Sequence, residues 1–338
     1  MGITRWLKRR SAEVPAFDRQ DVADAVERIT ALNPRLRLAA RYQQKLAPKT
    51  GEALAYIREL VEGLPAFREA SAACWSTDCC IRTCFATAEE VSAALSGATT
   101  LRDFFDSNPL AQEAYAVLGM TRTERHTLGV AAAGDSVRTD VAQTTYSFSE
   151  HQFRMCALTE AALREEIVGR MLDQLAIHGM ARIATKLSKR DTLKQEIALL
   201  KTRQRLLESK GQGIGAVVGG GAEPAIGELA KLNAQIAQND VELARLSEAT
   251  GTLERQLDIL IGVVGDVRKL LRVDYRCVRL SRMNVVLQDD DVAGDEIELA
   301  SASVPGDPPL VRTFMLVRIA RASIGPTRNL LDVAERFL

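Results

Sequence analysis

The stretch TLKQEIALLKTRQRLLESK, residues 192–210, is decisive for the fold, and a second stretch, GELAKLNAQIAQNDVELARLSEAT at 227–250, has the same pattern. In the first stretch the apolar residues recur every seven positions, at Leu193, Leu200 and Leu207, with Ile197 and Gln204 between them. In the second, two seven-residue series continue to residue 260: Leu229, Ile236, Leu243, Thr250 and Leu257, and Leu232, Asn239, Leu246, Leu253 and Leu260. Apolar residues at this spacing form a seam along which two helices pack. The pattern therefore predicts two long paired helices.

The segment between the two stretches favours a hairpin in which they pair with each other. Gly211–Gly221 is rich in glycine and is followed by Pro224, so a helix is not expected to continue through it. Residues 186–210 carry eight basic and three acidic side chains, whereas 228–258 carry three basic and six acidic ones. Opposite net charges attract the two arms, and each arm repels a copy of itself. We expect an antiparallel coiled-coil hairpin with its tip at 211–224, within long helices that cover 155–271.

Segments typical of β-strands flank this predicted hairpin on both sides. Thr127–Val130 and Val137–Phe148 are rich in Val, Thr, Tyr and Phe, and the segments after the hairpin, Asp274–Leu287, Glu296–Val304 and Arg312–Ala320, also have an extended pattern. The dipeptide Gly134-Asp135 between the first two is typical of a hairpin turn. The pattern predicts one small β domain, built from 127–149 and 274–321, into which the long helices are inserted.

The first third of the chain has helical periodicity interrupted by Pro and Gly. We expect a helical bundle over 17–125, with helices at Ala86–Leu95 and Pro109–Met120, since proline is common at the first position of a helix. A basic, flexible tail is expected over 1–16, and a short helix over 326–338 closes the chain. The predicted fold class is mainly α with a small β part (α+β): a helical bundle and a coiled-coil hairpin inserted in a small β-sheet domain.

Composition limits the classes of function. In the 338 residues, 46% are apolar, and 44 basic side chains balance 44 acidic ones, so no net field attracts nucleic acid. No run approaches the roughly 20 apolar residues of a membrane-spanning helix. The basic start of the chain lacks the apolar core of a secretory signal, so we expect a cytoplasmic protein with reduced cysteines.

Four cysteines cluster in the sequence at Cys74, Cys79, Cys80 and Cys84. Four thiolates could hold zinc or an iron–sulfur cluster. However, two Cys-x-x-Cys pairs are absent, and buried thiols also pack as small apolar side chains. We interpret these cysteines as core residues and expect no metal or cofactor, with metal binding as the open alternative.

Two other groups of residues are candidates for contact with a partner. Ile214, Val217 and Val218 are apolar residues in the predicted hairpin tip, where exposed apolar side chains indicate an interaction site. Trp6, Arg9 and Arg10 lie in the basic tail and could touch a lipid surface, although a single short cluster binds membranes only weakly.

Three functions remain compatible with these observations. The first is a non-enzymatic scaffold or adaptor that presents the hairpin to a protein partner. The second is an enzyme, redox or metal protein that uses the Cys74–Cys84 cluster. The third is a peripheral membrane protein that uses the tail and the hairpin tip. The absence of an intact catalytic motif favours the first.

Overall fold

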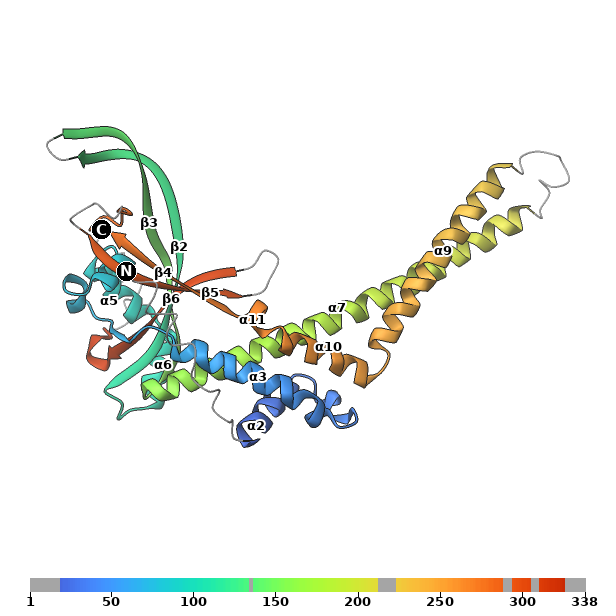
Figure 1. Ribbon diagram of the computed structural model, residues 1–338, viewed down its shortest axis with the longest axis horizontal. Coiled ribbons are helices and arrows are strands. Elements are labelled where there is room, and N and C mark those ends of the chain that lie inside the picture. The colour runs from blue at the N-terminus through green and yellow to red at the C-terminus, as the bar shows by residue number, and fades with distance from the viewer. Residues whose placement is uncertain (1–18, 134–135, 212–222, 288–293, 305–309, 326–338) are drawn as a thin grey trace, which may run out of the picture. The chain divides into compact units, whose positions relative to one another are not determined.

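The computed structural model of the protein describes residues 19–133, 136–211, 223–287, 294–304 and 310–325. It shows a mixed α+β protein (Figure 1). The chain divides into two compact units, each built from two separate stretches: unit 1 comprises 1–55 and 172–267, and unit 2 comprises 56–171 and 268–338. The helical bundle predicted over 17–125 is thus divided between the two units.

Unit 2 contains a single six-stranded sheet in the described residues. Its strands are β1 (Arg68–Glu69), β2 (Glu113–Ala133), β3 (Ser136–Ala157), β4 (Arg272–Leu280), β5 (Asp295–Val304) and β6 (Leu310–Ala320). The order is β3-β2-β6-β5-β4, and β1 lies beside the second half of β6. The β1–β6 pair is parallel and the others are antiparallel. Strands from before and after the long helices therefore share one sheet.

The prediction of a helix over Pro109–Met120 is wrong, because strand β2 begins at Glu113 within this segment. Four alternate side chains of the strand are fully buried, namely Ala114, Ala116, Leu118 and Met120. The intervening Tyr115 and Val117 are apolar as well, so the sequence shows no clean alternation of apolar and polar residues. Pairing with β6, from Glu113 opposite Ala320 to Met120 opposite Thr313, selects the extended conformation.

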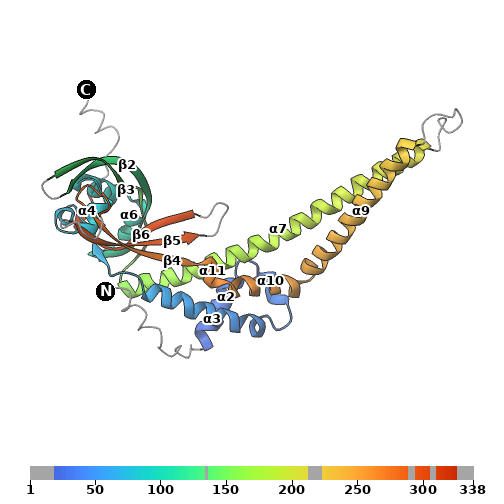
Figure 2. The same cartoon turned by 45° about the horizontal axis from the view of Figure 1, so that its top comes forward.

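The segment after β4 joins the two outer strands of the sheet. The amide of Val286 donates to the carbonyl of Thr144 in β3 at 2.8 Å, and the amide of Leu287 donates to the carbonyl of Arg279 in β4 at 2.9 Å. The amide of Tyr146 also donates to the carbonyl of Asn284, at 2.9 Å. The sheet is therefore curved, with its ends linked (Figure 2).

Short helices cover the buried face of this sheet. They are η2 (Ala73–Ser76), α4 (Cys79–Cys84), α5 (Ala88–Gly97) and α6 (Thr99–Ser107), and η3 (Arg321–Ser323) follows β6. Their apolar side chains form one core with β2, β3 and β6: Ile81, Phe85, Val91, Leu95, Leu101, Leu118, Phe153 and Val317 are among its members. Asp78 and Thr87 cap α4 and α5 by accepting hydrogen bonds from backbone amides.

Unit 1 is helical. Its elements are α2 (Arg19–Thr30), η1 (Pro34–Leu38), the first part of α3 (Tyr42–Glu62), most of α7 (Glu160–Gly211), α9 (Glu223–Thr250) and α10 (Leu253–Gly265), and α11 (Val267–Leu270) follows. A bidentate ion pair joins Arg28 of α2 to Asp173 of α7, with N···O distances of 2.7 and 2.8 Å. The long helices predicted at 192–210 and 227–250 are present as parts of α7 and α9.

The helix of the second arm does not continue to residue 260 as the repeat predicts. It ends at Thr250, and the hydroxyl of Thr252 accepts a hydrogen bond from the Arg255 amide at 3.3 Å to begin α10. Leu260 of α10 is fully buried, and a Cβ on Gly179 of α7 would lie 2.5 Å from its Cδ1. Glycine at position 179 therefore allows α10 to approach α7 closely.

In the described part of the chain, every helix is too short or too polar to cross a lipid bilayer.

Candidate interaction surface

The helices α7 and α9 run side by side in opposite directions (Figures 1 and 2). Three ion pairs link them: Lys189 with Glu242 at 2.5 Å, Lys201 with Asp240 at 3.8 Å, and Arg203 with Glu228. Residue numbers rise along α7 as they fall along α9, which is the antiparallel arrangement. Each pair is largely exposed and contributes at most about 1 kcal/mol, so the pairs set direction more than stability.

An inner seam of apolar side chains lies between the two helices. Leu193 and Ile197 of α7 are each 6% exposed, and Leu232 and Ile236 of α9 are 3% and 8% exposed. Asn239, in a seam position of α9, donates from Nδ2 to the carboxylate of Glu196 at 3.4 Å. The buried contact between the helices is therefore short and includes a polar position, which lowers its contribution to stability.

A second seam runs along the outside of α7. It comprises eight residues at alternating four- and three-residue spacing, all exposed and none charged: Ala181, Thr185, Ser188, Thr192, Gln195, Leu199, Thr202 and Leu206. Each lies two residues after an inner-seam position, and two residues turn a helix by about 200°. The outer α7 seam therefore faces away from α9.

Helix α9 has a corresponding outer seam of smaller residues. Its six members are also exposed and uncharged: Gly227, Ala230, Ala234, Ala237, Val241 and Ala244. Each lies two residues before an inner-seam position. At the overall charged fraction of 26%, about four of the 14 positions in the two outer seams would carry a charge. Most charged residues of both helices lie instead at positions beside these seams, and Lys186 and Arg190 occupy inner-seam positions of α7.

Three large apolar side chains on the outer seams are left in contact with water. Leu199 is 71% exposed, Leu206 is 59% exposed and Val241 is 71% exposed. Burying one such side chain contributes about 1.5–3 kcal/mol. Single exposed apolar residues are common, but Leu199 and Leu206 lie seven residues apart on one uncharged face of α7, and Val241 lies on the corresponding face of α9. The seven-residue repeat predicted the inner seam; the outer seams could have been found by the same 4-3 spacing.

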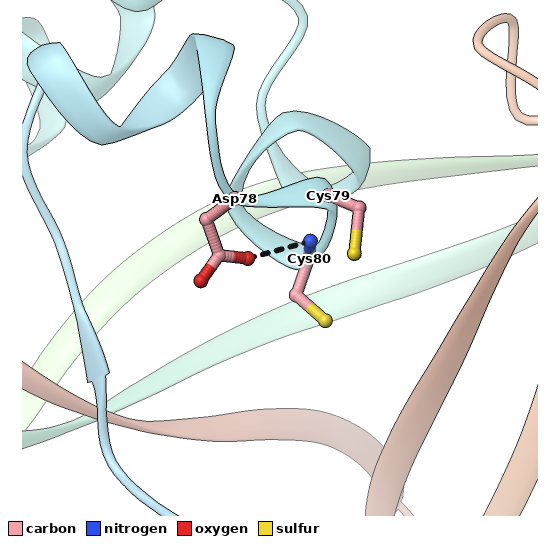
Figure 3. Close-up of side chains that lie close together, drawn as sticks. All are labelled: Asp78, Cys79 and Cys80. Carbon is pink, nitrogen blue, oxygen red and sulfur yellow. Dashed lines mark hydrogen bonds between the residues drawn. The ribbon is translucent and has the colours of Figure 1, made fainter.

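Of the four clustered cysteines, Cys79 and Cys80 begin α4 directly after Asp78 (Figure 3), whereas Cys84 ends this helix and Cys74 lies in η2. One ligand atom each of Asp78, Cys79 and Cys80 lies within 4.8 Å of the others. The Asp78 carboxylate already accepts hydrogen bonds from the amides of Cys80 and Ile81, at 2.8 and 3.2 Å, and from Arg68 at 3.1 Å. Capping the helix and pairing with Arg68 thus occupy the carboxylate that a metal would need.

The other sulfur atoms do not complete a ligand set in this geometry. Cys84 is buried, next to Ile81 in the core, and burial raises its pKa well above the ordinary value. Burial also raises the pKa of Cys80 to about 12. Cys74 accepts a hydrogen bond from Ser71 at 3.2 Å. Because the thiolate is the nucleophile, the raised pKa makes the two buried cysteines poor nucleophiles at neutral pH.

A shallow cleft of about 520 Å³ lies beside this cluster, and sequence reasoning did not find it. It is lined by Trp75, Ser76, Arg82, Ala86, Arg282, Met283 and Asn284. Trp75 donates to the Phe85 carbonyl at 2.9 Å, and Arg82 is paired with Asp295. Nearby, His151 donates from Nε2 to the Cys84 carbonyl at 2.7 Å and stacks on Phe85. These contacts tie helices to the sheet and leave no nucleophile paired with a base among the cleft residues.

Several predicted contact residues lie outside the described residues. They are Ile214, Val217 and Val218 of the hairpin tip and Trp6, Arg9 and Arg10 of the basic tail, and the helix predicted over 326–338 also lies outside these residues. Their roles stay predictions.

Comparison with known proteins assigns the chain to no family. No protein-family model, curated protein or solved structure matches it. The function is therefore inferred from the geometry of the chain itself.

Proposed function

We propose that this protein is a non-enzymatic scaffold or adaptor that presents an antiparallel coiled-coil hairpin, made by α7 and α9, to a protein partner. The observation that carries the proposal is the outer α7 seam, with its exposed Leu199 and Leu206. The 4-3 spacing of the inner seam, the buried Leu193 and Ile197, and the ion pairs between the helices support a coiled coil.

The chemistry of the outer seams favours protein over the other classes of partner. Uncharged side chains at 4-3 spacing match the surface of another amphipathic helix, on which apolar residues repeat at the same interval. Nucleic acid needs continuous rows of cations to contact phosphates, and the outer seams carry none. The basic residues beside the outer α7 seam are in part paired with acidic residues of α9, as Lys189 is with Glu242.

The metal or redox alternative has less support. In the described residues the candidate ligand group is limited to Asp78, Cys79 and Cys80, and the Asp78 carboxylate is already bonded to two amides and to Arg68. The membrane alternative depends on residues of the tail and the tip that lie outside the described part of the chain.

Site-specific photocrosslinking in cells of the source organism tests the proposal. A photoreactive amino acid at Leu199 or Leu206 of the full chain is expected to give discrete crosslinked products. The matched control is Leu128 of β2, which is equally exposed, at 71%, but lies in unit 2. Crosslinked products from neither seam position, or the same products from Leu128, would contradict the proposal.

A further inference from the structure

The two outer seams complement each other in the size of their side chains. The outer α7 seam contains large residues, including Gln195, Leu199 and Leu206, whereas the outer α9 seam is built from glycine, alanine and one valine. Small residues on one helix let a second helix approach closely, and large ones on the partner fill the space that is left. An outer α7 seam therefore fits an outer α9 seam better than it fits a copy of itself.

The charged residues near the seams also favour contact between an α7 face and an α9 face. Residues 181–208 of α7 carry eight basic and three acidic side chains. Residues 227–248 of α9 carry two basic and four acidic ones. Two α7 faces brought together would repel, and so would two α9 faces, but an α7 face and an α9 face attract. The inner α7–α9 pair, with its three ion pairs, already shows this attraction within one chain.

The two outer seams cannot meet within one hairpin, because they face opposite sides of it. The outer α7 seam is displaced by two residues forward from the inner seam and the outer α9 seam by two residues backward. Two residues turn each helix by about 200°, so on each helix the outer seam points almost directly away from the inner seam. Because the inner seams of α7 and α9 face each other, the two outer seams point in opposite directions. One outer seam therefore faces outward beyond α7 and the other outward beyond α9.

From these observations we propose that the hairpin binds a second copy of this chain, with the outer α7 seam of one copy packed on the outer α9 seam of the next. The contact is heterologous, so it extends from copy to copy and closes into a ring or continues as a filament. The seam on α7 spans residues 181–206, about 38 Å at 1.5 Å per residue, which is long enough to cover the whole α9 seam. This inference rests on the proposed function and names the partner.

Two variants of the full chain, each blocked on one face, test the inference. The α7-blocked variant carries Leu199→Glu and Leu206→Glu, which place negative charge against the acidic α9 face. The α9-blocked variant carries Ala237→Gln and Val241→Gln, which put long, uncharged polar side chains where the large α7 residues need small apolar ones. Leu128→Glu is the matched control at an equally exposed leucine in unit 2. Because all substituted positions are exposed, circular dichroism is expected to show unchanged helix content and melting temperature.

Sedimentation velocity over a range of protein concentrations gives the readout. We expect the wild type and the Leu128→Glu control to form species larger than one 37.0 kDa chain, in a concentration-dependent way. Each blocked variant alone is expected to stay a single chain. An equimolar mixture of the two is expected to form a two-chain complex and nothing larger, because the intact α9 face of one meets the intact α7 face of the other.

Three outcomes would overturn the inference. The first is a wild type that stays a single chain up to 100 µM. The second is self-association of the α9-blocked variant alone, which would indicate α7–α7 contacts. The third is a mixture that stays monomeric although the wild type associates. Photocrosslinking at Leu199 separates these failures from failure of the proposed function: a crosslink to a different protein retains the scaffold proposal and removes the second copy, whereas no crosslink at all removes both.

Discussion

The core of unit 2 and the α7–α9 pair use apolar residues in different ways. In unit 2, side chains from helices and three strands converge on one cluster in which Ile81, Leu95 and Leu118 are fully buried. In the α7–α9 pair, buried side chains such as Leu193, Ile197, Leu232 and Ile236 form a narrow seam, and large apolar side chains face water on the outer seams. Substitutions in the unit 2 core are therefore expected to cost more stability than substitutions in the α7–α9 pair.

Truncation of the unit 2 core is the change with the largest expected effect. Leu118→Ala removes a fully buried side chain on β2 and leaves a cavity, so the free energy of unfolding is expected to fall by about 2–5 kcal/mol. Leu128→Ala, on the same strand but 71% exposed, is expected to change it by less than about 0.5 kcal/mol. Chemical denaturation followed by circular dichroism measures both. Equal losses of stability at the two leucines would show that Leu118 is not in the core and Leu128 on the surface as described.

A methyl group at Gly179 tests the close contact at the base of α7. Its Cβ would lie 2.5 Å from Leu260, so Gly179→Ala is expected to lower the free energy of unfolding by about 1–3 kcal/mol. The matched control is Gly262→Ala on α10, which meets no heavy atom within 4 Å and is expected to stabilise by up to about 1 kcal/mol. Thermal denaturation distinguishes the two. A stabilising Gly179→Ala would show that α7 and α10 are not in close contact.

The inner seam of the α7–α9 pair is expected to contribute less. Ile197→Ala removes a side chain 6% exposed between only two helices, where neighbouring groups can relax, and about 1–2 kcal/mol of local stability is expected to be lost. Leu199→Ala, two residues along, is expected to leave local stability within about 0.5 kcal/mol of the wild type. Amide hydrogen exchange over residues 186–206 measures this loss. Identical exchange in both variants would place the inner seam on the wrong face of α7.

Alkaline pH is expected to lower the stability of unit 2 because of its buried thiols, which are protonated in both the folded and the unfolded state at pH 7. Burial raises the pKa of Cys80 to about 12, while an unfolded cysteine ionises near pH 8.5. The unfolded state therefore releases its proton first, and the stability of the wild type falls as pH rises from about 8.5 towards 12. Cys80→Ala is expected to show a shallower decline. Urea denaturation of the wild type and of Cys80→Ala at pH 7, 9 and 10 measures the two declines in stability. Equal declines in both proteins would argue against a buried, protonated thiol at Cys80.

Local periodicity predicted much of the architecture. The repeats at Leu193, Leu200 and Leu207 predicted a long helix because one face of a helix repeats every three to four residues wherever the helix packs. The strands of 137–148 and 312–320 were found in the same way, from residues whose branched or aromatic side chains suit an extended backbone. Mistakes arose where the local signal is ambiguous, as at Ala114–Met120, whose apolar residues suit either conformation.

The sequence by itself determined the helices of α7 and α9, their opposite charges and the 4-3 spacing of every seam, because these depend on residues close together in the chain. Tertiary structure alone decided which seam is buried, since α7 carries two seams and only pairing with α9 distinguishes them. It also ended the second arm at Thr250, and in the separate helix α10 Leu260 packs against Gly179 instead of extending the pair. The protonation state of Cys80 also depends on tertiary structure, because strands more than 60 residues away in the chain bury its thiol and raise its pKa.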